Sequence, residues 1–535
     1  MRSVTMKSTR TFITCFGLCS MLLLAFSNIF NRQPSDLDPP PKVTTTTDSK
    51  DPENPRDKLQ EGLLATEFDE SSCLSRYQSS MYRKPSPYKP SQYLISKLRT
   101  YERLHKHCGP DTEAYKRSKE QLDQHVTLSG SSGELCQYIV WVPLSGLGNR
   151  ILSLVSVFLY ALLTERVILV DQRNDIRDLF CEPFPATSWL LPLDFPLTDQ
   201  FDSFNWRTPI SYGNMLKRHV INSSTETFPS YLYLHLVHNY GDYDQMFFCQ
   251  GDQSLIKKVP WLIVKSDNYF IPSLWLIPSF QPELSKLFPQ KDTVFHHLAR
   301  YLIHPTNQVW GLVSRFYDAY LSRADETLGI QVRVFHRAGF HQLVMDQIVS
   351  CTQRENLLPE AAASQEEDSQ QVTNISRIQK LKAVLVTSLN PEYSNSLKRL
   401  YWEGLSFTGD IVGVYQPSQE MYQQRNKKLH NQKALAEMYL LSLTDNIVTS
   451  AWSTFGYVAQ GLGGMKPWIL YKVENYKAPD QPCVRATSME PCFHSPPFNG
   501  CEADTGTDAW KTVPYVRPCE DRISGLKLFD HPEEL

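Results

Sequence analysis

Three short segments combine glycine, arginine and hydroxyl side chains in arrangements that suit a phosphate-bearing ligand. The first runs from Gly146 to Arg150 (GLGNR) and follows an apolar, strand-like run. A helix that starts there would point its free backbone N–H groups at an anion, and Arg150 would add a fixed positive charge. We therefore expect Gly146, Gly148, Asn149 and Arg150 to bind an anion. The alternative is that the glycines only permit a tight turn.

The second segment, Gly329 to Phe335 (GIQVRVF), predicts a strand with Gln331 and Arg333 on one face. In a parallel sheet that is covered on both faces, an arginine needs an anionic partner. A guanidinium can bind a diphosphate through two hydrogen bonds and neutralise charge on a leaving group. The alternative is a structural ion pair. His336 and Arg337 follow directly and could reach the same ligand.

The third segment, Asp445 to Tyr457 (DNIVTSAWSTFGY), predicts a short strand, a hydroxyl-rich turn and a helix. Ser450, Ser453 and Thr454 could donate to phosphate oxygens together with the N–H groups of the helix start. For any one of these side chains, helix capping is the more common role. Gly461–Gly464 is expected to end the helix, because glycine readily adopts the left-handed cap conformation.

A proton acceptor is harder to find, and Asp267 is the best candidate. It stands where an apolar run that begins at Ile263 meets a polar turn, and residues at the ends of parallel strands commonly face a crevice. The alternative is an Asx turn, in which the carboxylate bonds its own backbone. Asp242 and Asp244 have the spacing of a DxD metal motif, but we interpret them as a loop pair and predict no metal site.

The elements that must position these residues alternate between strand-like and helix-like patterns. Strands are expected at 137–142 and 166–171, with an apolar helix between them. Further strands are expected at 329–335, 383–389, 411–415 and 466–473, with helices at 392–403 and 432–444. Strand, helix, strand is the unit of a parallel sheet, so the predicted fold class is α/β, with two Rossmann-like halves around one crevice.

The turn at Gly146 is also similar to a dinucleotide-binding fingerprint. Asp171 ends the second strand, where a ribose-binding carboxylate would stand, but Ile151 occupies the place of the third glycine. An NAD(P)-dependent oxidoreductase therefore remains an alternative that rests on Gly146, Gly148 and Asp171 alone.

The N-terminus has the pattern of a membrane anchor. Residues 11–30 contain no charged side chain, and as a helix they would span about 30 Å of bilayer. Arg2, Lys7 and Arg10 precede this run, which predicts a cytosolic tail at 1–10 and a lumenal remainder. The alternative is a signal peptide cleaved near Ser27. Residues 31–72 are rich in Pro, Thr, Asp and Lys and predict a flexible stem, followed by domains at 73–325 and 326–535.

Composition and cysteine usage agree with a folded, lumenal body. The 535 residues carry 54 Lys and Arg against 57 Asp and Glu, and a net charge of -3 excludes nucleic-acid binding through bulk charge. Two of the 12 cysteines lie in the anchor, so an even ten remain, which predicts up to five disulfides of open connectivity. Asn222 and Asn374 begin N-glycosylation sequons.

Four segments carry a family resemblance: GLGNRILS at Gly146, KSDNYF at Lys265, GIQVRVF at Gly329 and TSAWSTFGYVAQGLGG at Thr449. Over most of the chain after the stem, the sequence resembles the plant xyloglucan-type α-1,2-fucosyltransferase family. The resemblance implies a GT-B-like, inverting, metal-independent enzyme, held in the Golgi membrane as a single-pass type II protein. It would move L-fucose from GDP-β-L-fucose, a co-substrate and no resident cofactor, onto a galactose of a cell-wall glycan.

The same resemblance implies roles for individual residues. Arg333 would hold the diphosphate of the donor, and Asp267 would contact the acceptor, as a base or only as a positioning group. The nucleotide site would be lined by Thr449, Ser450, Ser453, Thr454 and Phe455. Without a metal, the charge that builds on the β-phosphate must be met by arginine and by oriented N–H or hydroxyl donors, which these segments supply.

Acceptor and oligomeric state stay open at this point. A xyloglucan side chain and an arabinogalactan-protein glycan are both candidate acceptors, and loops between Trp189 and Gln250 would decide between them; a homodimer is one candidate assembly. The main alternative function is a catalytically silent, membrane-anchored protein of the same fold that binds glycans or acts as a scaffold. The presence of Arg333, Thr454 and Asp267 argues against it.

Overall fold

The computed structural model describes residues 57–123, 136–173, 175–334, 340–360, 379–403, 409–424, 427–473, 480–497, 501 and 513–530. All of them belong to one compact unit, Arg56–Leu535. The anchor expected at 11–30, the sequon at Asn374 and the pair His336 and Arg337 lie outside the described residues. Among the described helices, α5 (Leu147–Thr164) is long and apolar enough to cross a membrane, but 83% of it is buried inside the protein, so it is a core helix.

The first half is built on a four-stranded parallel sheet of order β2-β1-β4-β3. Its strands are β1 (Tyr138–Pro143), β2 (Val167–Val170), β3 (Tyr231–Leu236) and β4 (Trp261–Ser266). They are apolar and almost wholly buried, as in parallel sheets that are covered by helices on both faces. α5 connects β1 to β2, which confirms the predicted strand, helix, strand unit.

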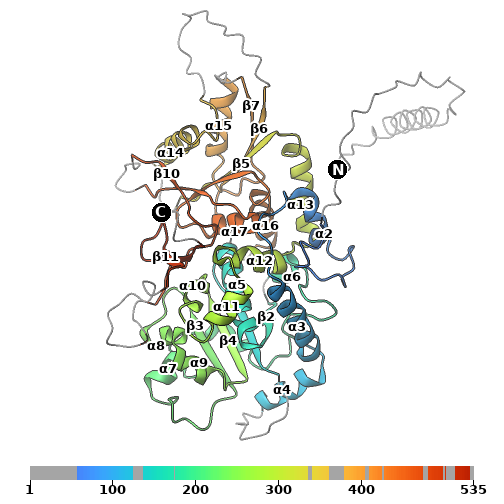
Figure 1. Cartoon of the computed structure of the whole chain (residues 1–535), viewed down its shortest axis with the longest axis vertical. Coiled ribbons are helices and arrows are strands. Elements are labelled where there is room, and N and C mark those ends of the chain that lie inside the picture. Colours follow the sequence, from blue (N-terminus) through green and yellow to red (C-terminus); the bar gives the residue numbers. More distant parts are fainter. Residues whose placement is uncertain are drawn as a thin grey trace, which may run out of the picture. The chain divides into compact units, whose positions relative to one another are not determined.

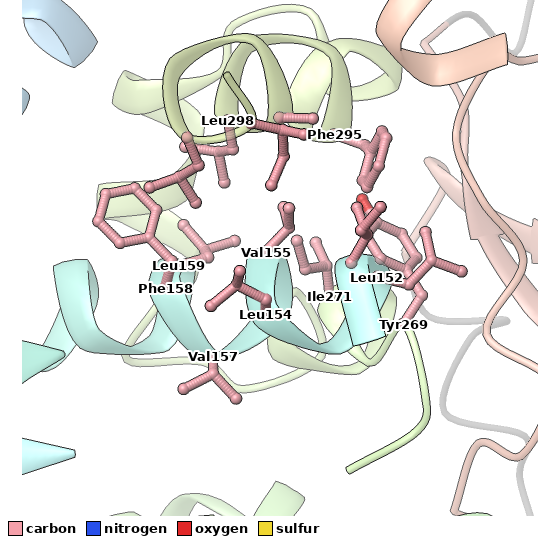
Figure 2. Close-up of a cluster of buried hydrophobic side chains, with 14 of the residues drawn as sticks. Leu152, Leu154, Val155, Val157, Phe158, Leu159, Tyr269, Ile271, Phe295 and Leu298 are labelled. Carbon is pink, nitrogen blue, oxygen red and sulfur yellow. The ribbon is translucent and has the colours of Figure 1, made fainter. Parts of the chain in front are cut away.

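Many helices surround this sheet, and α5 is the central one. Figure 2 shows its side chains, among them Leu152, Val155 and Leu159, facing Phe295 and Leu298 of α12. This apolar contact fixes α5 against α12, and thereby the position of its N-terminus. The other helical elements of this half are α2 (Leu74–Tyr82), α3 (Gln92–Cys108), α4 (Glu113–Asp123), α6 (Ile176–Leu179), η1 (Thr198–Ser203), α7 (Tyr212–Lys217), α8 (Asp242–Gln245), η2 (Met246–Phe248), α9 (Gln250–Ile256), α10 (Ile271–Leu274), α11 (Gln281–Leu287), η3 (Lys291–Thr293), α12 (Val294–Leu302) and α13 (Asn307–Tyr320).

The second half contains a six-stranded sheet of order β10-β9-β8-β5-β6-β7, in which β10 alone is antiparallel. Helices α5, α12, α16 and α17 lie between the two sheets (Figure 1). The predicted pair of α/β halves is therefore confirmed. The elements are β5 (Glu326–Gln331), α14 (His341–Arg354), β6 (Leu381–Thr387), α15 (Glu392–Glu403), β7 (Ile411–Tyr415), α16 (Lys428–Leu441), β8 (Asn446–Ser450), α17 (Thr454–Gly463), β9 (Trp468–Leu470), β10 (Cys483–Arg485) and a hairpin of β11 (Val516–Pro518) and β12 (Leu526–Leu528).

One strand lies earlier in the chain than predicted. β5 covers Glu326–Gln331, whereas the sequence pattern placed a strand at 329–335. Gln331 is the last residue of β5 that pairs with β6 and β8. The Val332 N–H still donates to the Thr387 carbonyl at 2.9 Å, but the Arg333 N–H donates to the Ser450 hydroxyl and not to a neighbouring strand, so the ladder ends there. Arg333 consequently lies beyond the carboxyl end of the strand and not on a face of the sheet, which is the place where ligands meet open α/β sheets.

Residues 57–72, which the sequence pattern assigned to the flexible stem at 31–72, are part of the folded unit. Leu63, Leu64 and Ala65 are buried, and the two leucines belong to the main hydrophobic core together with Leu94 and Leu98 of α3. This short apolar triplet gains enough from burial to order the chain around it, although the composition of the wider region is polar.

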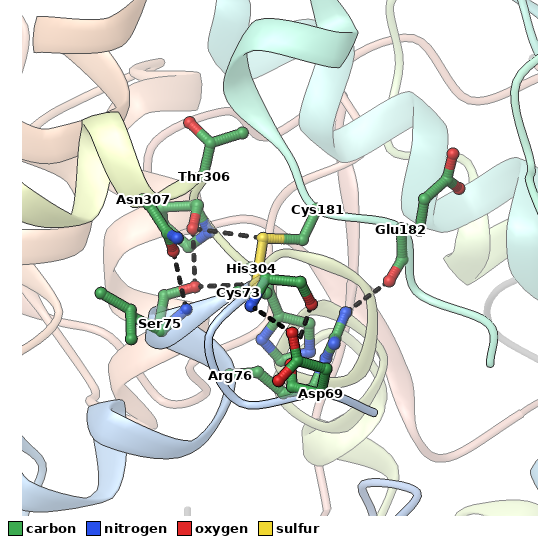
Figure 3. The surroundings of a disulfide bond; sticks show 12 residues. Asp69, Cys73, Ser75, Arg76, Cys181, Glu182, His304, Thr306 and Asn307 are labelled. Atoms are coloured by element: carbon green, nitrogen blue, oxygen red, sulfur yellow. Dashed lines mark hydrogen bonds between the residues drawn. A yellow bond between two sulfur atoms is a disulfide. The ribbon is translucent and has the colours of Figure 1, made fainter. Parts of the chain in front are cut away.

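The ten cysteines from Cys73 onward form five disulfides, which settles the connectivity that the sequence left open. Figure 3 shows Cys73–Cys181, which lies beside Ser75, whose hydroxyl donates to the Pro305 carbonyl at 2.7 Å. It fastens the start of α2 to the first half. Cys249–Cys501 joins α9 to the C-terminal segment across 252 residues of sequence. The remaining pairs are Cys108–Cys136, Cys351–Cys483 and Cys492–Cys519.

Candidate active site

A cavity of about 410 Å³ lies between the two halves, where the strands of both sheets end. The residues that follow β1, β3 and β4 line it from one side, and those that follow β5, β6 and β8 line it from the other. Parallel α/β sheets place ligands at this edge. The lining residues are Ser145, Gly146, Leu147, Gly148, Asn149, His238, Asp267, Gln331, Val332, Arg333, Thr387, Ser388, Leu389, Ser418, Glu420, Gln423, His430, Asn431, Ala434, Glu437, Met438, Trp452, Ser453, Thr454, Phe455 and His494.

Two helix N-termini meet in this cavity. Gly146 is the N-cap of α5, and Ser453 is the N-cap of α17, where its hydroxyl accepts the Gly456 N–H at 3.4 Å. A Cβ at Gly148 would lie only 2.7 Å from Thr454 Oγ1, so this glycine is required for the close approach of the two helices. Because both helices direct their positive ends at the same space, the cavity attracts a negatively charged group.

Side-chain bonds hold the two helix ends together. Thr454 Oγ1 donates to Asn149 Oδ1 at 3.1 Å, and Asn149 Nδ2 donates to the Asp267 carbonyl at 2.9 Å. Asn149 thus links the second half to the strand end that carries Asp267. The predicted cap of α17 is confirmed, since Gly464 follows the helix with a left-handed φ of 72°.

Arg333 reaches the cavity from the end of β5. Its backbone N–H donates to Ser450 Oγ at 2.9 Å, and its Nη2 donates to Gln423 Oε1 at 3.0 Å. Gln423 also lines the cavity. Ser450 therefore supports the backbone of Arg333 from β8, and the guanidinium joins the two helix N-termini as a third positive group.

Asp267 is paired with a histidine that the sequence analysis missed. The Asp267 carboxylate accepts the backbone N–H of His238 at 2.9 Å and lies 2.5 Å from its Nδ1. Because Nδ1 donates its proton to the carboxylate, Nε2 carries the lone pair. The Asp267 side chain is only 4% exposed, whereas that of His238 is 64% exposed. The sequence could have indicated His238 as a site residue, because it follows the apolar run of β3 in the same way as Asp267 follows the apolar run of β4.

Three of the residues predicted to bind the anion do not line the cavity. Arg150 is buried and forms an ion pair with Asp175 at 2.7 Å, since one further residue along α5 turns its side chain about 100° away from Asn149. Thr449 is buried beneath Gly456, where an added Cβ would lie 2.9 Å from the Thr449 side chain. Ser450 has the supporting role described above. The other predicted residues, Gly146, Gly148, Asn149, Asp267, Arg333, Ser453, Thr454 and Phe455, come together in the cavity.

Two further carboxylates have structural partners. Asp171 is bound by Arg173 at 2.9 Å and lies outside the cavity, so the geometry does not support its role as a ribose ligand. Asp244 caps the short helix α8 by accepting the Gly241 N–H at 3.1 Å, and burial raises its pKa to about 6. Asp242 and Asp244, which were expected to be a loop pair, thus lie in the short helix α8. Asn222 of the first sequon is exposed, as glycosylation requires.

A buried acid, Glu437, and a histidine, His494, complete the walls of the cavity. Burial raises the pKa of Glu437 to about 8, so its side chain is protonated at neutral pH; it accepts the Ser418 hydroxyl at 2.5 Å. On the opposite side, burial lowers the pKa of His494 to about 4. Tyr457 donates to Asp521 at 2.5 Å, so His494 Nε2 is the donor in its 3.0 Å contact with the tyrosine oxygen. The cavity therefore has a neutral acid on one wall and a neutral histidine on the other.

Glu490 joins the C-terminal segment to the first half and makes stability depend on pH. It accepts the Phe295 N–H at 2.7 Å and the Tyr269 hydroxyl, and burial raises its pKa to about 8. A raised pKa means that the folded state binds the proton more tightly than the unfolded state. The stability that this group contributes is therefore full below about pH 4.5 and is lost as pH rises through 8.

We expect the free energy of unfolding in urea to fall between pH 7 and 8.5, and Glu490→Gln to reduce that slope. The buried histidines do not contribute in this window, because burial lowers their pKa values, to about 4 in His105, and they stay neutral above pH 7 in both states. One pKa unit corresponds to about 1.4 kcal/mol, which is measurable. Glu326→Gln is the control, since two lysines hold the Glu326 pKa at about 2. Equal slopes in the wild type and the Glu490 variant would contradict the assignment.

The chain is similar to known proteins over most of its length. The chain matches the family model described as "Xyloglucan fucosyltransferase" over residues 40–502. It is 67% identical over 524 residues to "Probable fucosyltransferase 7" of Arabidopsis thaliana, which covers 97% of this chain and 98% of the relative. It is 63% identical over 542 residues to "Galactoside 2-alpha-L-fucosyltransferase" of the same plant, covering 98% and 94%.

One solved structure matches along its whole length. It is a point mutant of Arabidopsis thaliana FUT1 in complex with GDP, which superimposes with a TM-score of 0.81 at 65% sequence identity and covers 88% of this chain and 100% of that chain. The similarity therefore includes both α/β halves.

Proposed function

This chain belongs to the xyloglucan fucosyltransferase family and is a fucosyltransferase, and from that premise we propose that it transfers L-fucose from GDP-β-L-fucose to a galactose of a cell-wall glycan in α-1,2 linkage. The observation that carries the proposal is the meeting of two helix N-termini and Arg333 opposite the Asp267–His238 pair in one cavity. Positive groups suit a diphosphate, and a histidine nitrogen with a free lone pair suits a hydroxyl.

The donor would bind with its diphosphate between the N-termini of α5 and α17. Arg333 would contact the β-phosphate, and the nucleoside would lie toward the wall that contains Ser418 and Glu437. As the bond to fucose breaks, charge builds on the β-phosphate oxygen. Fixed N–H dipoles and a guanidinium stabilise that charge more than they stabilise the ground state, which is how they would accelerate the reaction.

The acceptor would enter from the side of His238. Its hydroxyl oxygen forms a bond to C1 of fucose on the face opposite the phosphate, and the C1–O bond to the β-phosphate breaks. The hydroxyl proton moves to His238 Nε2, and GDP leaves with the bonding electrons. Inversion at C1 converts the β-linked donor into an α-linked product. Asp267 would orient the imidazole and stabilise its protonated form.

We also propose that the protein is a single-pass type II protein of the Golgi membrane, with the described part in the lumen. Support comes from the uncharged run at 11–30, the preceding basic residues and the five disulfides, which are typical of an oxidising compartment. Between the two acceptors, the family favours xyloglucan over arabinogalactan-protein glycans.

The proposal is tested with the full-length chain in detergent, radiolabelled GDP-fucose and EDTA. We expect label on fucose-free xyloglucan, and we expect an α-1,2-specific fucosidase to remove it. Arabinogalactan and xyloglucan stripped of galactose are the comparison acceptors, and label on the latter would refute galactose as the acceptor. Binding of GDP in calorimetry without transfer to any galactosylated glycan would instead indicate a silent glycan-binding protein.

A further inference from the structure

A second cavity, of about 150 Å³, lies at the other end of α17 from the active site, against α12. It is formed by the first described residues, by the segment that follows α2 and by one face of α12. Arg83, His297 and Arg300 are buried at its floor, and Asp57 and Glu61 are exposed at its rim. The other lining residues are Gln60, Leu63, Ser80, Lys84, Pro85, Ser86, Tyr88 and Pro90.

The two floor arginines are buried without a counter-charge. Each is 9% exposed, and the Nε atom of each is buried with no hydrogen-bond partner. Within the part of the chain that the structure describes, neither guanidinium has a carboxylate at ion-pair distance. Burial, and to a lesser extent the nearby charge of Arg83, lower the pKa of Arg300 to about 9. An arrangement of this kind is costly unless an anion compensates it.

The groups that do contact these arginines are neutral. Arg300 Nη1 donates to His296 Nε2 at 3.2 Å, and His296 Nδ1 donates to the Gly461 carbonyl at 2.8 Å, so His296 is an uncharged acceptor. The Arg83 guanidinium lies over the Tyr439 ring, 4.7 Å from its centroid. Burial keeps His297 neutral as well, with a pKa of about 3. None of these contacts cancels a full charge.

The two rim carboxylates are engaged elsewhere. Asp57 accepts the backbone N–H groups of Leu59, at 2.9 Å, and of Glu61. Glu61 pairs with the exposed Lys89 at 3.6 Å. Lys84, a further positive residue of the cavity, pairs with Asp445. The floor therefore keeps two guanidiniums without a counter-charge beside a cavity that is large enough for a small ion.

We propose that this cavity is a binding site for a phosphate-type oxyanion, held by Arg83 and Arg300. Two guanidiniums present paired N–H donors that match the oxygens of a tetrahedral anion. The anion would also tie the segment at 57–64 to α12. Nothing in the transfer reaction uses this site, because it lies behind α17 and does not share a lining residue with the active-site cavity.

The test is a titration of the full-length chain with inorganic phosphate in the presence of saturating GDP, which occupies the anion site of the active cavity. Ionic strength is kept constant with chloride. We expect one phosphate to bind per chain in calorimetry, and the melting temperature to rise with phosphate concentration. Arg300→Met is expected to abolish both effects. In phosphate-free buffer this variant should be at least as stable as the wild type, because it removes one of two opposing charges.

Arg300→Lys is the second variant, in case the methionine variant does not fold. It keeps the charge and loses the paired donors, so phosphate affinity should fall roughly tenfold while the fold is retained. Arg354→Met, at an exposed arginine paired with Glu355, should leave phosphate binding unchanged. The proposal would be overturned if the wild type did not bind phosphate, or if both Arg300 variants bound phosphate as tightly as the wild type. A glycerol phosphate arm and an arm with vesicles that contain phosphatidic acid distinguish a free from a lipid-borne phosphate.

Discussion

Replacing His238 by glutamine is expected to lower kcat for fucose transfer by about 10²- to 10⁴-fold, the usual contribution of a general base. The imidazole Nε2 of His238 carries a free lone pair in the cavity, because Nδ1 lies 2.5 Å from the Asp267 carboxylate. Glutamine keeps the polarity and approximate size of the side chain but cannot take a proton. The measurement is steady-state transfer from GDP-fucose to galactosylated xyloglucan, with GDP affinity determined separately. GDP affinity should not change.

Companion variants separate a chemical role from a structural one. Asp267→Asn should lower kcat by a similar or larger factor, since the amide no longer favours the tautomer that leaves Nε2 free. Added imidazole should restore part of the activity of His238→Ala, because the exposed side chain leaves an open space. His107→Gln, at an exposed position of α3, is the control that should keep full activity. Full activity in His238→Gln would refute the role of His238 and leave Asp267 as a positioning group.

Replacing Arg333 by alanine is expected to lower kcat/KM by about 10²- to 10³-fold, which is the range for losing one donor that stabilises a developing negative charge. Arg333 lies at the carboxyl end of β5, held by Ser450 and directed toward Gln423 in the cavity. Affinity for GDP should fall in parallel. Arg333→Lys should recover only part of the loss, because lysine keeps the charge but not the two parallel donors. Calorimetry with GDP and transfer kinetics measure the two effects.

Arg150 provides the matched contrast to Arg333. Its side chain is buried in an ion pair with Asp175, so Arg150→Met would remove the charged partner of a carboxylate that is only 14% exposed and leave it with the Asn431 amide, at 2.5 Å. We expect this variant to lose about 3–5 kcal/mol of stability while a folded fraction still binds GDP. Unfolding in urea measures the loss of stability, and GDP calorimetry measures ligand binding, so together they distinguish a structural from a ligand-binding role of Arg150. The two assignments would be reversed if Arg150→Met abolished GDP binding at unchanged stability while Arg333→Ala kept it.

Local patterns in the sequence determined much of this protein. Apolar runs predicted β1, β2, β7 and the helix α15, and the glycines around 461–464 predicted the end of α17, because strand and helix periods and cap conformations depend on neighbouring residues alone. Parallel strands also bring their carboxyl ends to one edge. For that reason Asn149, Asp267, Arg333 and Thr454 could be placed in one site before any contact was known.

Only the tertiary structure decided which partner each of these residues has. His238 and Asp267 stand 29 residues apart and meet because β3 and β4 are neighbours in the sheet. Arg150 faces Asp175 and not the ligand, and the five disulfides join cysteines up to 252 residues apart. Leu63 and Leu64 are ordered by a core that their own polar neighbourhood does not predict. Residue types and periodicity act over a few residues, whereas ion pairs, hydrogen bonds and packing depend on the arrangement of the whole fold.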